Sequence, residues 1–282
     1  MQGSPFSTLQ RMRSRLVLAM AANLAARLTA RLTANLAAVL AAVLLTGCTA
    51  EAATRTVGDG VTRAEAAVLA ELLHRNHEEG GADFVVTAPY REGVVLTLTG
   101  EVDFRDGVGR AQAVTTFGTD REDDVRTVFF TADEVWTGDV PGLADALADA
   151  GDRTATYLRR ELTTTAADAE PLLADVLVTL LLRLSAESAD EPESFVGADY
   201  AWQGQRSIDS RLATVFGLRA GRTVAVSASD DLMLQFSTPM LDGAFDATIT
   251  LSDHGRRSVE LPTDEETAEA ADHPDIAEAL GV

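Results

Sequence analysis

The chain has 282 residues, of which 23 are basic and 44 acidic, and its formal net charge is −21. An anionic surface of this strength repels nucleic acid and anionic lipid head groups. Neither is therefore expected to bind through general electrostatic attraction. All the positive charge comes from arginine, and Cys48 is the only cysteine. Neither an intramolecular disulfide nor a cysteine-based metal site can therefore form.

Cys48 ends the sequence Leu-Thr-Gly-Cys, which follows a segment rich in alanine and leucine. Residues 1–47 hold five arginines and no acidic residue. This pattern resembles the lipobox of bacterial lipoproteins. It predicts that residues 1–47 are a signal peptide and that Cys48 is lipidated, on the outer face of the cytoplasmic membrane. The alternatives are an inert buried thiol and an uncleaved anchor, although the uncharged run 32–47 is shorter than the ~20 residues that span a bilayer.

The segment after Cys48 divides by composition. Residues 48–61 are small, polar and glycine-containing, which predicts a flexible tether. Thr62 and Glu65 have capping-box spacing and start an amphipathic helix that ends at the glycines 80 and 81. Its apolar stripe, formed by Val68, Leu69, Leu72 and Leu73, is expected to pack on the sheet. The folded domain is expected to cover residues 62–262. The acidic residues 263–282 are expected to form a tail that adds little to the core, with one weak helix near 275–280.

Alternating apolar and polar residues predict strands through most of the domain. In the clearest of these strands, residues 94–104, one face is apolar and the other is polar, which indicates an antiparallel sheet with a solvated side. The expected strands cover residues 83–88, 94–104, 109–117, 125–131, 134–137, 155–160, 198–206, 212–218, 223–228, 232–237, 245–252 and 257–261. The first five are expected to form a meander of hairpins.

Two helices are expected between the strands at residues 134–137 and 198–206. One is short, over residues 141–150, and the other, residues 171–184, is the most apolar segment after Cys48. Its polar residues Asp175, Thr179 and Arg183 follow each other at four-residue spacing and form one narrow stripe. A helix with so little polar surface must bury apolar side chains on two sides.

The sequence holds no recognisable catalytic motif. His74 and His77 have helical spacing next to acidic residues, but without a third ligand they indicate a solvated helix end rather than a metal site. His254 and His273 are the remaining candidate bases, and both lie in predicted turns. We therefore expect no enzyme activity, no cofactor and no bound metal, and treat an envelope hydrolase as a remote alternative.

The order of elements resembles the LppX/LprG (LprAFG) group of actinobacterial lipoproteins, which share the LolA-like fold. The resemblance depends on residues 134–138 (EVWTG), the apolar helix 171–184, residues 197–206 and the turn 251–255 (LSDHG). It implies an α+β fold in which a curved antiparallel half-barrel sheet of about 11 strands wraps a few helices. It also implies a cavity that takes acylated lipids or glycolipids for transport or presentation in the cell envelope.

Strand alternation and helix periodicity, rather than any family motif, identify candidate lipid-binding residues. They are Leu96, Leu98, Phe104, Phe129, Leu173, Leu177, Leu180, Leu181, Leu184, Trp202, Leu234 and Phe236. We expect a monomer held at the membrane by its lipid anchor and binding a lipid or glycolipid. The alternative is an interaction or sensor lipoprotein with a filled core, acting on a membrane-protein partner.

Overall fold

The computed structural model describes residues 55–118, 121–163, 172–197, 199–240 and 243–281. Residues 56–282 form one compact unit that contains every helix and strand given below. The signal peptide, Cys48 and the first residue of the predicted apolar helix, Pro171, lie outside the described residues. In the described part of the chain, no helix is long and apolar enough to cross a membrane.

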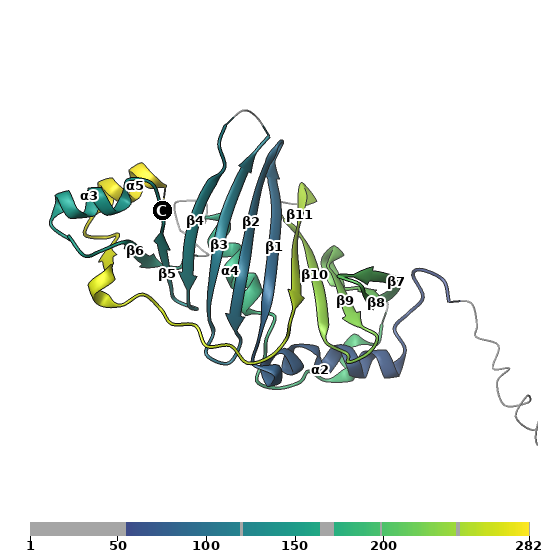
Figure 1. Cartoon of the computed structure of the whole chain (residues 1–282). Helices are drawn as coiled ribbons and strands as arrows, with labels where there is room; N and C mark the ends of the chain where they lie inside the picture. The colour runs from purple at the N-terminus through teal and green to yellow at the C-terminus, as the bar shows by residue number, and fades with distance from the viewer. Residues whose placement is uncertain (1–54, 119–120, 164–171, 198, 241–242, 282) are drawn as a thin grey trace, which may run out of the picture. The chain divides into compact units, whose positions relative to one another are not determined.

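One open, curved sheet of 12 strands organises the domain, in the order β12-β6-β5-β4-β3-β2-β1-β11-β10-β9-β8-β7 (Figure 1). The first set of strands is β1 (Gly81–Arg91), β2 (Val94–Asp103), β3 (Val108–Phe117), β4 (Asp124–Phe130), β5 (Glu134–Gly138) and β6 (Tyr157–Glu161). Each pairs antiparallel with the next one in the chain, which confirms the expected meander.

A second meander follows the helices and extends the same sheet. It consists of β7 (Ala201–Ile208), β8 (Arg211–Gly217), β9 (Thr223–Ser227), β10 (Met233–Met240) and β11 (Phe245–Ser252). The two meanders are joined by antiparallel pairing of β1 with β11, in which Phe84 lies opposite Leu251 and Val86 opposite Ile249. This contact between strands far apart in sequence produces one α+β sheet, as the predicted fold class requires.

Helix α2 (Arg63–Glu79) has the predicted capping box. The Thr62 hydroxyl accepts a hydrogen bond from the Glu65 backbone N–H, and the Glu65 carboxylate accepts one from the Thr62 N–H at 2.8 Å. Gly80 ends the helix in the left-handed conformation, with φ of 96°. The end of the predicted tether, just before this helix, is attached to the sheet. Gly58 and Asp59 exchange backbone hydrogen bonds with Trp202 on the edge strand β7.

Helix α4 (Leu173–Leu182) lies against one face of the sheet, behind β1 to β3 in the view of Figure 1. Its side chains Leu177 and Leu181 are fully buried in the main core. On the sheet side, the rings of Phe84 and Phe130 lie 6.2 Å apart. Phe130 packs directly over Gly109, where a Cβ atom would lie only 2.2 Å from the ring. The centre of this face is therefore filled.

The polar stripe of α4 is exposed only at its end. Asp175 is 1% exposed, and its two carboxylate oxygens accept hydrogen bonds from the Arg160 guanidinium at 2.7 Å each. The Asp175 carboxylate also accepts the Thr163 N–H at 2.9 Å. Arg183, at the helix C-terminus, is exposed. An ion pair with β6 thus fixes the start of the helix against the sheet.

The segment after residue 252 differs from expectation. Residues 257–261, predicted as a strand, form no strand. Strand β12 (Thr267–Glu269) instead pairs parallel with β6, so the sheet is not wholly antiparallel. Helix α5 (Pro274–Leu280) forms where the weak helix was expected.

The acidic C-terminal segment also builds a second, smaller core. Ala268 and Ala277 pack with Leu158 and with two leucines of α3 (Leu143–Ala150), the helix predicted over residues 141–150. Alternation could not reveal this packing, because the segment is short in apolar residues and buries them against elements far away in sequence. It is part of the folded structure rather than a loose tail.

Candidate functional site

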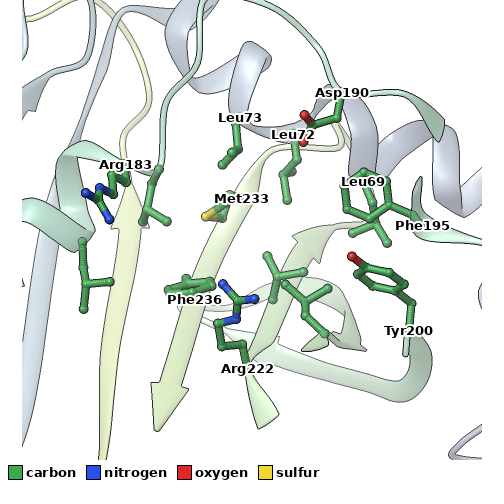
Figure 2. A pocket seen from close by; sticks show the side chains of 14 residues that line it. Leu69, Leu72, Leu73, Arg183, Asp190, Phe195, Tyr200, Arg222, Met233 and Phe236 are labelled. Atoms are coloured by element: carbon green, nitrogen blue, oxygen red, sulfur yellow. The ribbon is translucent and has the colours of Figure 1, made fainter. Parts of the chain in front are cut away.

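The best candidate site is a pocket of about 360 Å³ beside the filled centre (Figure 2). It lies between α2, the C-terminal end of α4, strands β9 and β10, and the loops before β7 and β9. Its apolar lining is Leu69, Leu72, Leu73, Leu180, Leu184, Phe195, Leu218, Val224, Met233 and Phe236. Tyr200, Arg183, Asp190 and Arg222 supply the polar groups.

Helix α2 provides one wall. Leu69, Leu72 and Leu73 recur at the spacing of one helical face, which points them together toward the sheet. Leu69 and Leu72 are almost completely buried, whereas Leu73 is partly exposed. The stripe that the sequence assigned to packing on the sheet therefore also lines a cavity.

A β-bulge shapes the opposite wall. Met233 pairs with Val226 and Phe236 with Val224, and the register shifts between Met233 and Gln235. The extra residue in β10 places Met233 and Phe236 on the same face, although they are three residues apart. Both therefore line the pocket.

Two arginines and one aspartate stand among the apolar groups. The Arg222 Nε donates a hydrogen bond to the Arg219 carbonyl oxygen at 3.0 Å, while Arg183 and Asp190 make no side-chain hydrogen bond to another described residue. Within the described ranges, no carboxylate forms an ion pair with Arg183 or Arg222. Figure 2 shows Arg222 and Phe236 among the lining side chains, and Asp190 on the side of α2.

Only part of the predicted set meets at this pocket. Leu180, Leu184 and Phe236 line it. Leu96, Leu98, Phe104, Leu177 and Leu181 are buried in the main core, and Leu173 and Trp202 are partly buried against it.

Phe129 and Leu234 lie away from the pocket. Phe129 alternates with the core residues Val128 and Phe130 along β4, and its ring meets Tyr157 edge-on at 5.7 Å. Leu234 packs in a separate small cluster with Val215 and Ala225. The bulge in β10 explains the second case, because strict alternation from Phe236 predicts that Leu234 shares its face.

Sequence reasoning missed most of the pocket. The α2 leucines were recognised as a buried stripe but not as cavity lining, and Met233 was hidden by the bulge. Phe195 ends a short 3-10 helix (Pro192–Phe195), and Tyr200 lies in the loop before β7. Their rings lie 5.2 Å apart, and both come from segments too short to carry a periodic signal. Only the apolar character of these positions was visible in the sequence.

The candidate bases do not form a recognisable catalytic site. Burial, and next the positive charge of Arg211, lower the pKa of His254, while Glu79 and Asp230 oppose that shift. His273 lies 2.6 Å from the Asp152 carboxylate. Among the described residues, no serine or threonine hydroxyl is hydrogen-bonded to either histidine.

His74 and His77 do not belong to a metal cluster. The His74 Nδ1 lies 3.4 Å from the Ala186 carbonyl oxygen, and its Nε2 lies 3.7 Å from Glu78. Over the described ranges, no group of three histidine, cysteine or acidic side chains is close enough to hold a metal ion.

Comparison with known proteins gives matches only at the level of structure. No family model and no curated protein sequence matches the chain. An uncharacterized conserved protein from Thermus thermophilus is 12% identical over 72% of this chain and 97% of its own, with a TM-score of 0.35. LprF from Mycobacterium bovis is 12% identical over 72% of this chain and 98% of its own, with a TM-score of 0.42. At these TM-scores, neither match assigns a family or a function to this chain.

Proposed function

We propose that this protein is a membrane-anchored, non-enzymatic lipoprotein that binds the acyl chain of a lipid or glycolipid. The pocket between α2, α4, β9 and β10 holds the chain, and the protein carries or presents the lipid in the cell envelope. The predicted lipidation of Cys48 keeps the domain at the membrane from which the lipid is taken.

The observation that carries this proposal is the apolar pocket itself. Its volume of about 360 Å³ falls at the lower end of the ~300–1,000 Å³ typical of small-molecule sites. Ten of its lining residues are apolar, and they come from α2, α4, the sheet and the connecting segments between them. An acyl chain gains free energy in such a site chiefly by leaving water, at roughly 25 cal/mol per Å² buried.

A second candidate is the interaction or sensor lipoprotein with a filled core. The packing beneath α4 favours it, since Leu177, Val178 and Leu181 are at most 1% exposed. In that case the side pocket is incidental, and the domain acts on a membrane-protein partner through its surface. The two candidates differ in whether the pocket retains lipid.

Lipid retention can be tested on residues 49–282, which include the whole compact unit. We expect native mass spectrometry and solvent extraction to find a bound lipid. Leu180→Trp should fill the pocket and reduce the retained lipid at least fivefold. The matched control is Leu172→Trp, because Leu172 precedes the same helix, is 45% exposed and does not line the pocket.

Two results would reject lipid binding. One is a folded wild-type protein without lipid that also binds none when offered acyl lipids in vesicles. The other is equal lipid retention in the two tryptophan variants, with circular dichroism showing that both are folded. Either result favours the filled-core candidate.

The anchor has its own test in the full chain. Replacing Cys48→Ala should abolish metabolic labelling with a fatty-acid analogue and release the protein from membranes. Unchanged labelling would show that the lipobox interpretation is wrong, whatever the pocket binds.

A further inference from the structure

The rim of the pocket carries two arginines that form no ion pair with a carboxylate in the part of the chain that the structure describes. Arg183 and Arg222 are both exposed and both line the pocket. They come from different elements, Arg183 from the C-terminal cap of α4 and Arg222 from the residue before β9. In a chain with a net charge of −21, a local pair of cations at an apolar cavity needs an explanation.

Other arginines of this chain are paired with carboxylates. Arg219, three residues before Arg222, is 3.2 Å from the Asp199 carboxylate. Arg160 is paired with Asp175 at 2.7 Å. By contrast, no carboxylate of the described chain lies within ion-pair distance of Arg183 or Arg222, so their charge remains available to a ligand.

Arg222 is also held in place. Its carbonyl oxygen accepts a hydrogen bond from the Leu218 N–H at 2.7 Å, and its Nε donates to the Arg219 carbonyl at 3.0 Å. These bonds hold the guanidinium in place and leave its two terminal amino groups without a hydrogen-bond partner among the described residues. A guanidinium presented in this way suits the oxygens of a carboxylate or phosphate.

Asp190 makes the α2 side of the pocket unfavourable for an anionic group. Its backbone N–H donates to the Ala70 carbonyl at 2.9 Å, which places it on the α2 side of the pocket. Because its carboxylate repels an anion, a negatively charged head group is favoured on the side of the arginines. The net charge of the protein opposes anions at long range, so any preference must come from this local arrangement.

We propose that the pocket selects single-chain lipids with a compact anionic head group, a carboxylate or a phosphate, bound between Arg183 and Arg222. This inference rests on the proposed function, because it requires that the pocket holds an acyl chain. The limited volume supports one chain rather than several. The head group stays at the rim, where both arginines are exposed, and the chain extends among the α2 leucines, Met233 and Phe236.

The test compares head groups on chains of equal length, using residues 49–282 freed of lipid. A saturated fatty acid and a monoalkyl phosphate represent the two anionic sources, and the matching fatty alcohol is the neutral probe. We expect both anions to bind about five- to tenfold more tightly than the alcohol. The preference should shrink as salt rises from about 0.01 M to about 1 M, because the charges are exposed.

Matched double variants test whether Arg183 and Arg222 cause the preference for anions. Arg183→Gln with Arg222→Gln should bring the anions to within about twofold of the alcohol while leaving alcohol binding unchanged. Arg63→Gln with Arg153→Gln removes the same charge from exposed arginines that do not line the pocket, and should keep the preference.

Each outcome separates this inference from the proposed function. If no probe binds the folded protein, acyl binding itself is rejected. If all three probes bind equally, or the pocket double variant keeps the preference, the pocket takes acyl chains but the arginines do not select the head group. A preference for only one anion assigns the head group to a carboxylate or to a phosphate.

Discussion

The same face of the sheet is covered in two ways. Beneath α4, the rings of Phe84 and Phe130 and the side chains of Leu177 and Leu181 leave no space. Toward β9 and β10, the covering helix is α2, and a pocket of about 360 Å³ remains between it and the end of α4. The sheet alone therefore does not decide where a cavity forms. The helix that covers each stretch, and the side chains it brings, decide it.

The filled centre and the pocket should also differ in what they contribute, the first chiefly to stability and the second to binding. The filled centre should contribute most of the free energy of unfolding, because removing a closely packed group leaves a void that its neighbours cannot fill. The walls of the pocket should tolerate truncation better, since they already face open space. Substitutions in these two regions can confirm or break this distinction.

The largest effect is expected for Leu177→Ala at the filled centre. Leu177 is 0% exposed, so the substitution should lower the free energy of unfolding by about 4 kcal/mol. Leu180→Ala removes the same atoms from the same helix but from the pocket wall, and should cost about 1 kcal/mol. Urea denaturation of both variants measures the difference. Equal losses would mean that the pocket is as closely packed as the centre.

A somewhat smaller effect is expected for Asp175→Ala, which leaves Arg160 without its partner. Breaking a buried ion pair costs about 3 kcal/mol, and here the Thr163 N–H also loses its acceptor. The variant should lower the free energy of unfolding by about that amount in urea denaturation. Glu187→Ala, at an exposed position without an ion pair in the described chain, is the control.

The Asp175 variant also tests whether stability and binding are separate, because it loosens the start of α4, while the pocket lies at the other end of the helix. Lipid binding to the folded variant should therefore remain close to that of the wild type. A loss of binding larger than the loss of stability would show that the ion pair also positions the pocket wall.

Local elements followed closely from the sequence. The capping-box residues Thr62 and Glu65 predicted the start of α2, and alternation predicted β1 through β11. The strong apolar character of α4 correctly implied burial on more than one side. These features depend on hydrogen bonds and periodicity within a few residues, so they can be recognised without knowing what lies on the other side of the fold.

Contacts between distant segments could not be predicted in this way. The polar residues of α4 form one stripe in the sequence, but their exposure in the structure differs. Asp175 is buried and paired with Arg160, and only Arg183 is exposed. The C-terminal acidic segment, assigned to a tail, forms β12 and α5 and packs on α3 and β6. In both cases the partner that makes burial favourable lies in another element.

Most helices and strands could be assigned from the sequence alone, and Cys48 could be recognised as the expected site of the anchor. Three features could be seen only in the folded structure: β1 pairs with β11, the bulge in β10 puts Met233 and Phe236 on one face, and Arg183 and Arg222 line the same pocket. The physical reason is the range of the interactions. Periodicity and capping act along the chain, whereas a cavity is the space left between elements after they have packed.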